Sequence, residues 1–292
     1  MPYRSGFAPG LFEGLDIVVT GGGSGLGRCI AHELVALGAR IALVGRRSDR
    51  LETVREELAQ EGGEAFSFAC DIRDEEGVTA TVGRIVETLG RIDGLVNNAG
   101  GQFPALLRDL SLNGWNAVVA NNMTGTFLFS REVYRQSMED RGGSIVNVGA
   151  DHELGMPGMG HNGSARAGQA NFTLTASVEW AHSGVRVNHV VPGFIASSGL
   201  DAYPASAAET FRQVRPRIPQ KRFGNEAEVS AAVLFLLSPM AAYVNGATLR
   251  VDGGLHNSIG GFYRVPEHDR SPTWEGYHLS ETPKVLRNPK QP

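Results

Sequence analysis

A glycine-rich turn placed directly after an apolar segment limits the fold of this chain more than any other part of the sequence. Residues 16–20 (Asp-Ile-Val-Val-Thr) form a predicted strand, and Gly21-Gly22-Gly23-Ser24-Gly25-Leu26-Gly27 leads from it into a predicted helix. Glycine is required for the turn out of the strand, at Gly25 for the close approach of a diphosphate, and at Gly27 for close helix packing. The free N–H groups at the start of that helix would face the phosphates. A glycine-rich turn is weak evidence by itself, but its place between a first strand and a first helix predicts a dinucleotide site.

The rest of the chain alternates short apolar segments with amphipathic ones. Predicted strands occupy 16–20, 40–45, 65–70, 93–97, 143–148, 185–191 and 247–251, and predicted helices occupy 26–37, 48–61, 74–89, 115–135, 164–181 and 231–237. Continuous apolar strands separated by helices are typical of a parallel sheet with both faces covered. We therefore expect a single-domain α/β fold, a doubly wound (Rossmann) parallel sheet of about seven strands.

Two regions lack this alternation. We expect residues 12–255 to form the core of the one domain, residues 194–222 to form a substrate flap on it, and residues 256–292 to form a polar C-terminal tail. The chain shows no linker that would separate a second domain.

Charge and cysteine content exclude several classes of protein. Lys and Arg number 27 against 31 Asp and Glu, a formal net charge of −4, so no basic excess favours nucleic acid as a partner. The longest apolar runs fall far short of the roughly 20 residues that span a bilayer, and residues 1–16 lack the apolar centre of a signal peptide. Cys29 and Cys70 lie in separate predicted buried elements, which excludes a disulfide scaffold. We expect a cytoplasmic protein without membrane contact.

The residues after the second and third predicted strands indicate which dinucleotide binds. Arg46 and Arg47 follow the second strand. An arginine here favours a 2′-phosphate, whereas an acidic residue would bind the ribose hydroxyls instead. These arginines predict NADP(H), and the alternative is a solvated charge at the start of a helix. Asp71 is placed to accept a hydrogen bond from the adenine amino group, and residues 97–100 (Asn-Asn-Ala-Gly) bring polar amides beside the adenosine ribose.

The chain resembles the short-chain dehydrogenase/reductase superfamily over roughly 12–255, in Thr20-Gly-x-x-x-Gly-x-Gly27, Asn97-Asn-Ala-Gly100 and Pro192-Gly193. Within that superfamily it is similar to the trans-2-enoyl-CoA reductases of the peroxisomal type, in Gly100-Gly-Gln-Phe103 and in residues 161–168 and 263–269. The dienoyl-CoA reductases are the next most similar group. The resemblance implies NADP(H) as cofactor, with contacts from Gly21, Ser24, Gly25, Leu26, Gly27, Arg46, Arg47, Asp71, Ile72, Asn98, Ala99, Gly100, Arg166, Pro192, Gly193 and Ile195.

The usual catalytic residues of the superfamily are replaced in this chain. Aligned on residues 167–168, the tyrosine position is Asn162, the lysine position is Arg166, and the serine position is Gly149 or Ala150. The asparagine of the set is retained as Asn122. Because asparagine cannot donate a proton at neutral pH, carbonyl reduction through a phenol is not expected.

Reduction of an enoyl thioester requires different catalytic groups from reduction of a ketone. Charge develops on the thioester oxygen, where a hydrogen-bond donor such as Asn162 supplies much of the stabilisation. Arg166 lies four residues later on the same helix face, where it would hold the cofactor ribose, or else form a salt bridge to a neighbouring helix. The resemblance and this chemistry together imply an NADPH-dependent reductase of an α,β-unsaturated acyl thioester, with acyl-CoA as the partner substrate. The alternatives are a ketoreductase that uses a histidine or water as the proton donor, and a dinucleotide-binding pseudoenzyme.

Candidate proton donors follow the fifth predicted strand. A free histidine titrates near neutrality and can donate a proton, so His152 and His161 are candidates. Tyr203 in the flap is a weaker candidate. A metal held by residues 151–153 with His161 is not expected, because consecutive residues rarely converge on one ion. The superfamily buries the helices equivalent to 115–135 and 164–181 between subunits, so the resemblance implies a homotetramer.

Overall fold

Seven parallel strands form the central sheet of this computed structural model, which describes residues 2–203, 207–258 and 263–287. The strand order is β3-β2-β1-β4-β5-β6-β9. The chain therefore reverses its winding between β1 and β4, the switch point at which open α/β sheets bind ligands. The prediction of a doubly wound sheet of seven strands is confirmed. The strands are β1 (Asp16–Thr20), β2 (Arg40–Gly45), β3 (Ala65–Ala69), β4 (Gly94–Asn97), β5 (Gly143–Val148), β6 (Val185–Pro192) and β9 (Thr248–Val251).

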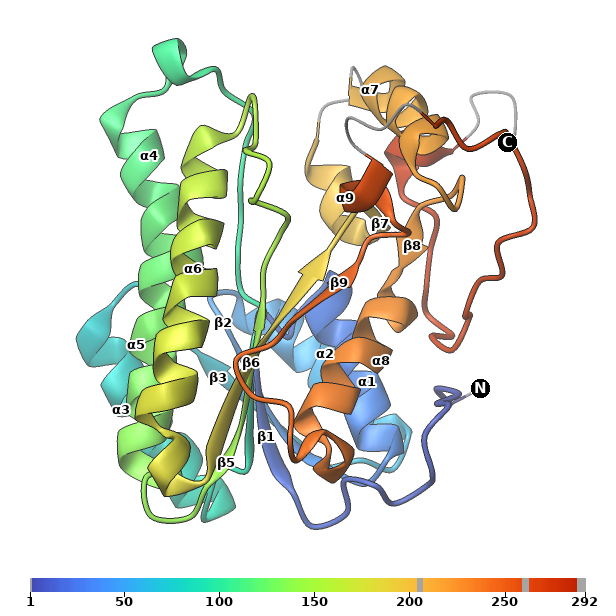
Figure 1. The fold of residues 1–292 in the computed structure, drawn as a ribbon. Helices are drawn as coiled ribbons and strands as arrows, with labels where there is room; N and C mark the ends of the chain where they lie inside the picture. The colour runs from blue at the N-terminus through green and yellow to red at the C-terminus, as the bar shows by residue number, and fades with distance from the viewer. Residues whose placement is uncertain (1, 204–206, 259–262, 288–292) are drawn as a thin grey trace.

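Helices cover both faces of this sheet (Figure 1). One layer holds α1 (Gly25–Ala36), α2 (Ser48–Gln60) and α8 (Glu226–Leu237), and the other holds α3 (Glu75–Leu89), α4 (Leu112–Val119), α5 (Gly125–Val133) and α6 (Gly160–Glu179). Strand side chains alternate between two apolar clusters: Ile17 and Val19 pack under the first layer, whereas Val18 packs under the second. Burial on both sides explains why the strands read as continuous apolar segments.

The helix bounds differ from the predicted ones for identifiable reasons. The helix predicted at 115–135 runs from α4 through α5, with π-helical turns at Ala120–Thr124 and Tyr134–Met138. The helix predicted at 231–237 begins earlier, at Glu226, because Asn225 and Glu228 form a capping box there. An apolar run locates the buried face of a helix and not its ends.

The segment predicted as a flap contains regular structure at the carboxyl end of the sheet. It includes β7 (Ile195–Ala196), which pairs with β8 (Gly224–Asn225), and α7 (Ala207–Val214). These elements lie with α9 (Leu255–Ser258) in the upper right part of Figure 1, near the carboxyl ends of β6 and β9.

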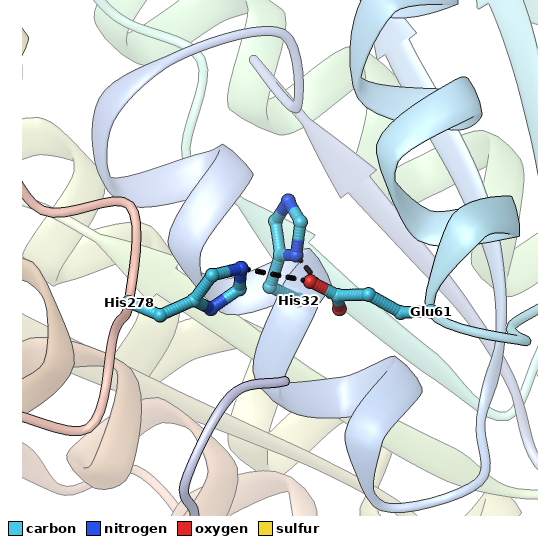
Figure 2. A group of neighbouring side chains, drawn as sticks. All are labelled: His32, Glu61 and His278. Carbon is cyan, nitrogen blue, oxygen red and sulfur yellow. Dashed lines mark hydrogen bonds and ion pairs between the residues drawn. The ribbon is translucent and has the colours of Figure 1, made fainter. Parts of the chain in front are cut away.

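The polar tail folds back on α1 and α8 instead of remaining apart from them. Tyr277 is buried in a small apolar cluster with Tyr3, Cys29 and Ala227, and the rings of Tyr3 and Tyr277 lie 5.8 Å apart. The next residue, His278, lies beside His32 and Glu61 (Figure 2). The thiols of Cys29 and Cys70 are free and buried.

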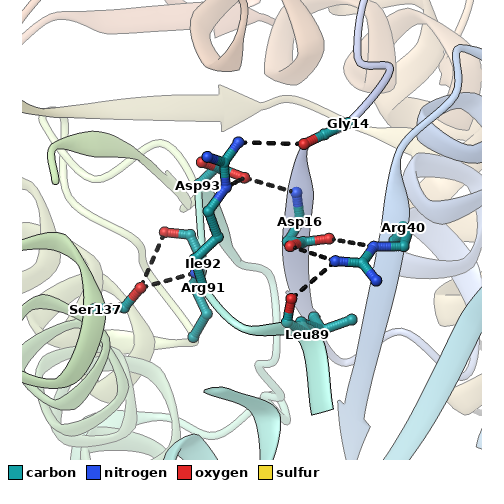
Figure 3. Close-up of polar contacts among 8 residues, drawn as sticks. All are labelled: Gly14, Asp16, Arg40, Leu89, Arg91, Ile92, Asp93 and Ser137. Atoms are coloured by element: carbon teal, nitrogen blue, oxygen red, sulfur yellow. Dashed lines mark hydrogen bonds and ion pairs between the residues drawn. The ribbon is translucent and has the colours of Figure 1, made fainter. Parts of the chain in front are cut away.

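Ion pairs close the amino-terminal edge of the sheet (Figure 3). Arg40 donates to both carboxylate oxygens of Asp16, at 2.7 and 2.8 Å, and to the carbonyl of Leu89 at 2.8 Å. Asp93 accepts from the backbone N–H of Asp16 at 2.9 Å and from Arg91 at 2.9 Å. These bonds join β1, β2 and the start of β4 at the end opposite the glycine-rich turn. Within the described ranges, no helix combines the length and the apolar character needed to cross a membrane.

Candidate active site

The glycine-rich turn has the shape that a dinucleotide diphosphate requires. Gly21 and Gly25 have φ angles of +67° and +51°, in the left-handed region that glycine adopts without strain. A β-carbon on Gly27 would overlap the carbonyl of Gly21, so α1 begins tightly against the end of β1. A β-carbon on Gly25 would meet the Ser198 hydroxyl as its nearest atom, at 3.6 Å, so this side of the turn is open. The Ser24 side chain does not cap α1. The first backbone N–H groups of α1 are therefore available to bind a phosphate of a nicotinamide dinucleotide.

Thr20 joins the loop after β4 to this turn. Its hydroxyl accepts hydrogen bonds from the backbone N–H groups of Asn98 and Ala99, each at 3.0 Å. Asn98 Nδ2 donates in return to the carbonyl of Thr20 at 3.0 Å. Leu26 packs against the apolar cluster under α1. The two predicted binding loops therefore form one surface at the switch point between β1 and β4.

The residues predicted to bind the adenosine end follow β2 and β3. Arg46 and Arg47 are exposed. The Asp71 carboxylate accepts from Arg73 Nε at 2.9 Å, and this bond lowers the pKa of Asp71, with a smaller contribution from the charge of Arg46. Ile72 is buried. Asp71 is therefore paired with Arg73 and lies close enough to Arg46 for their charges to interact.

The segment predicted to face the nicotinamide end leaves the carboxyl end of β6. Pro192 is the last residue of β6, and the Gly193 N–H donates to the Val251 carbonyl at 2.9 Å. A β-carbon on Gly193 would lie 2.7 Å from the α-carbon of Asp252, so only glycine allows these two backbone segments to come so close. Ile195 is buried in β7.

The two asparagines singled out in the sequence are in direct contact. Asn122 lies in the first π-helical turn and Asn162 in α6, and both are fully buried. Asn122 Nδ2 donates to Asn162 Oδ1 at 2.8 Å and to the Gly101 carbonyl at 3.0 Å. Asn122 Oδ1 accepts from the Gly101 N–H at 2.9 Å. This saturated set of bonds fixes the orientation of both amides, and π-helical turns occur often at functional sites.

The donor side of Asn162 faces Gln102 and Met156. Asn162 Nδ2 donates to Gln102 Oε1 at 2.5 Å and to the Met156 sulfur at 3.1 Å. Gln102 Nε2 donates to the Tyr203 hydroxyl at 2.9 Å. The amide chain therefore runs from the buried Asn122 to Tyr203 in the flap segment. A thioether is a weak acceptor, so the N–H directed at Met156 is the one that a better acceptor displaces.

Arg166 is a buried cation between β5 and α6. Its Nη1 donates to the Val148 carbonyl and to Gln169 Oε1, each at 3.0 Å. A β-carbon on Gly100 would lie 2.5 Å from its Nη2, so Gly100 makes room for the guanidinium. Burial lowers the pKa of Arg166 to about 10, which leaves it charged at neutral pH. Within the described part of the chain it has no carboxylate partner and its Nε has no hydrogen bond. The predicted alternative of a salt bridge to a neighbouring helix is wrong for these residues.

His189 is a site residue that the sequence pattern did not reveal. Its ring, in the middle of β6, is fully buried and fills the space that a side chain on Gly149 would need. Burial lowers the pKa of His189 to about 3, with further contributions from the charges of Arg166 and His152. Neither ring nitrogen finds a hydrogen-bond partner among the residues that the structure describes. The only signal in the sequence was a histidine within a strand that also carries Arg186 and Asn188, so it did not stand out.

The other candidate acids differ in their access to the site. His152 is half-buried, with Nδ1 3.1 Å from the Ala150 carbonyl and its ring 6.2 Å from that of His189. His161 is fully buried against Phe103, with ring centroids 4.7 Å apart, and burial lowers its pKa.

The two carboxylates beside His152 are engaged elsewhere. Asp151 pairs with His256 at 2.9 Å, and Glu153 pairs with Arg250. Of the group at 151–153 and 161, His152 is the residue best placed to reach a ligand.

Comparison with known proteins assigns this site to a family. The family described as "Enoyl-(Acyl carrier protein) reductase" matches residues 21–256. A peroxisomal 2,4-dienoyl-CoA reductase [(3E)-enoyl-CoA-producing] of Danio rerio is 38% identical over 86% of this chain and 85% of its own length. A probable 2,4-dienoyl-CoA reductase [(2E)-enoyl-CoA-producing] of Bacillus subtilis is 32% identical over 82% of this chain and 95% of its own length.

A solved structure gives the same family and fold. The citronellol catabolism dehydrogenase AtuB of Pseudomonas aeruginosa is 52% identical, with a TM-score of 0.79 over 87% of this chain and 99% of that one. Members of this superfamily are oxidoreductases that bind nicotinamide dinucleotides, as the glycine-rich turn requires. The chain therefore belongs to the short-chain dehydrogenase/reductase superfamily, within the family described as enoyl-(acyl carrier protein) reductase.

Proposed function

We propose that this chain is an NADPH-dependent reductase of an α,β-unsaturated acyl thioester, of the trans-2-enoyl-CoA or 2,4-dienoyl-CoA kind. The observation that supports this most is the buried amide pair Asn122–Asn162, in which Asn162 stands at the position where the family resemblance implies a tyrosine. An amide donates hydrogen bonds but does not release a proton at neutral pH. Ketone reduction requires a proton on oxygen, whereas an enoyl thioester carries charge on its oxygen only transiently. The relatives named 2,4-dienoyl-CoA reductase support the same substrate class.

Conjugate reduction explains why a hydrogen-bond donor is enough at this position. When bound, NADPH supplies a hydride to the β-carbon of an enoyl thioester, or to the δ-carbon of a 2,4-dienoyl thioester. In both substrates the displaced electron pair moves to the thioester oxygen, and the carbonyl re-forms when a proton adds to the α-carbon. For the diene this leaves one double bond at carbon 3, in agreement with the product named for the Danio rerio relative.

In this proposal Asn162 stabilises the charged oxygen. The oxygen takes over the N–H that Asn162 directs at the Met156 sulfur, while Gln102 keeps the other N–H. Asn122 holds Asn162 Oδ1 and so sets the direction of the donor before substrate arrives. One such donor, oriented in advance, contributes roughly 10²- to 10³-fold to the rate.

Arg166 and the two arginines after β2 would hold the cofactor. The unpaired Nε and the charge of Arg166 suit the hydroxyls of the nicotinamide ribose. Arg46 and Arg47 suit a 2′-phosphate, which supports NADPH over NADH. Two buried free thiols are compatible with a reducing cytoplasm, where we place the enzyme.

The α-carbon proton would come from His152 or from a water held by it. His152 is half-buried with its ring 6.2 Å from that of His189, whereas His161 is enclosed. A histidine donates a proton effectively near neutral pH.

We also propose that the enzyme assembles as a homotetramer through α5 and α6. Phe127 is 40% exposed on α5, and Leu174 and Val178 are 54% and 77% exposed on α6. Exposed apolar side chains on neighbouring helices are typical of surfaces that pair in symmetric oligomers.

Steady-state assays with several substrates test the function. We expect NADPH oxidation with crotonyl-CoA, with a longer 2-enoyl-CoA or with a 2,4-dienoyl-CoA, and little with the matching 3-ketoacyl-CoA. The name of the AtuB relative favours a second candidate, an alcohol dehydrogenase, so citronellol with NADP⁺ is included. Turnover of the ketone or the alcohol alone would overturn the proposal. Tight NADPH binding without any turnover would instead indicate a pseudoenzyme.

A further inference from the structure

Two histidines and a glutamate from three distant segments meet on the outer face of α1 (Figure 2). His32 lies in α1, Glu61 follows α2, and His278 lies in the tail. His32 Nδ1 is 3.1 Å from Glu61 Oε2, and His278 Nε2 is 2.9 Å from Glu61 Oε1. We propose that these three side chains bind a divalent cation of the zinc class, which fastens the tail to α1 and α2.

The donor set has the chemistry that zinc selects. One possible ligand atom from each of the three residues lies within 4.8 Å of the other two, and no other group of this kind occurs in the described ranges. Two imidazoles and one carboxylate are common zinc ligands, and a water completes the four-coordinate shell. Metal–ligand distances of about 2.0 Å place neighbouring donors roughly 3.3 Å apart. The distances from Glu61 to the two imidazoles, 3.1 and 2.9 Å, are already close to this spacing.

The second nitrogen of His32 is held as in many metal sites. His32 Nε2 lies 3.3 Å from Glu57 Oε2, on the side of the ring that faces away from the cluster. Arg28 donates to both oxygens of Glu57, each at 2.7 Å. A carboxylate on the outer nitrogen of a histidine fixes the tautomer and directs the other nitrogen at the metal. Because Glu57 can hold the Nε2 proton, His32 Nδ1 is available as a metal ligand when an ion replaces its hydrogen bond to Glu61.

Burial and access also fit a site that a metal enters from solvent. The His32 side chain is fully buried, whereas those of Glu61 and His278 are 15% and 20% exposed. The rings of His32 and His278 lie edge to face with centroids 5.6 Å apart. The carboxylate and the tail histidine therefore form the open side of the cluster.

A bound ion would act at the junction between the tail and the cofactor turn. Four residues that follow His278 line a cavity of about 160 Å³ together with Gly25 and Arg28, namely Leu279, Glu281, Thr282 and Pro283. A cation at His278 holds this part of the tail in place from one side. Because the unfolded chain has no such site, binding raises the stability of the fold.

Calorimetric titration of the full-length protein, stripped by a chelator, with Zn²⁺ alone tests the site. We expect one equivalent bound with micromolar or tighter affinity. His278→Ala should weaken this by more than 10-fold, and His182→Ala, which removes an exposed histidine elsewhere, should leave it unchanged. Zn²⁺ should raise the melting temperature of the wild type and of His182→Ala, and should raise that of His278→Ala much less. Equal binding by wild type and His278→Ala would overturn the proposal.

A second variant separates a metal ligand from a hydrogen-bonding carboxylate. Without an ion, Glu61 would simply accept hydrogen bonds from both imidazoles. Glu61→Gln keeps an acceptor oxygen but is a poor zinc ligand. We expect it to lose the Zn²⁺ affinity while its metal-free melting temperature stays close to that of the wild type. A large loss of metal-free stability with unchanged Zn²⁺ binding would show a hydrogen-bonded cluster only. Neither measurement requires turnover, so the metal site is tested independently of the proposed reaction.

Discussion

The imidazole of His189 occupies the space into which a side chain on Gly149 would project. Gly149 directly follows β5, whereas His189 lies in the middle of the neighbouring strand β6, and the Gly149 N–H donates to the carbonyl of Val190, the residue after the histidine, at 2.8 Å. A side chain on 149 and a large ring on 189 therefore exclude one another.

This exclusion predicts a non-additive pair of substitutions. Gly149→Ser alone should destabilise the protein by about 1–3 kcal/mol, because the new side chain overpacks the site. Gly149→Ser with His189→Ala should recover much of that stability, because the ring is gone. Denaturant unfolding of the two single variants and the double variant gives the coupling energy. Additive losses would show that the ring moves aside freely, which would contradict the fixed packing described above.

The amide donor predicts a selective loss of rate. Asn162→Ala should reduce kcat for an enoyl-CoA on the order of 10²-fold, because the charged oxygen loses its donor. The NADPH dissociation constant should change less than twofold, whereas Arg166→Ala should raise it. Met156→Leu provides the matched control, since it removes only the competing acceptor and should preserve kcat. Full activity in Asn162→Ala would move the oxyanion role to another donor.

The arginines after β2 predict the cofactor. Arg46→Ala should weaken NADPH binding on the order of 10-fold and leave NADH binding nearly unchanged, because only NADPH offers a 2′-phosphate for a charge-assisted bond. Fluorescence titration with both cofactors measures this, with Arg108→Ala as a control at an exposed position in a short 3-10 helix. Tighter binding of NADH by the wild type would rule out the NADP(H) preference.

His189 predicts that stability falls in mild acid. Burial lowers the pKa of His189 from 6.5 to about 3, so below pH 6.5 the unfolded chain binds a proton that the folded protein does not. The folded state therefore loses stability as the pH falls from about 6.5 toward 3, by about 2 kcal/mol between pH 7 and pH 5. His189→Gln should remove this part of the pH dependence, and His182→Gln should retain it. Identical slopes in urea unfolding for wild type and His189→Gln would contradict the neutral buried ring.

The exposed apolar residues of α5 and α6 predict assembly. Light scattering at micromolar concentration should give the mass of four chains for the wild type, and Phe127→Glu with Val178→Glu should reduce it, because charges oppose burial at an interface. Glu56→Lys on α2 should leave the mass unchanged. A monomeric wild type would refute the tetramer.

The strands and the cofactor turn were predictable because their signals are local. Apolar β-branched runs such as 16–20 and 143–148 have one stable environment, between two helix layers. The glycines at 21, 25 and 27 are needed for backbone conformation and close approach, which spacing alone indicates. Sequence analysis also predicted that Asn122 and Asn162 belong to one site, and in the structure the two side chains are in contact.

The parts that sequence analysis missed depend on contacts between distant residues. His189 reaches Gly149 from another strand, and nothing within residues 185–191 shows that its ring points there. The tail reads as polar because a few buried residues, such as Tyr277, are separated by exposed ones. The bond between Gln102 and Tyr203 joins residues 101 positions apart. Such pairings follow from the fold and not from any periodic pattern.

The small cluster around Cys29 also sets an order of events during synthesis on the ribosome. Tyr3 and Cys29 emerge early, but Tyr277, which completes their cover, emerges roughly 250 residues later, about 12 to 50 s at common elongation rates. During that interval the outer face of α1 is uncovered and its thiol is open to oxidants. Once the tail has docked, burial raises the pKa of the Cys29 thiol well above its usual value. We therefore expect the Cys29 thiol to react with oxidants more readily in the growing chain than in the finished protein, where it is buried.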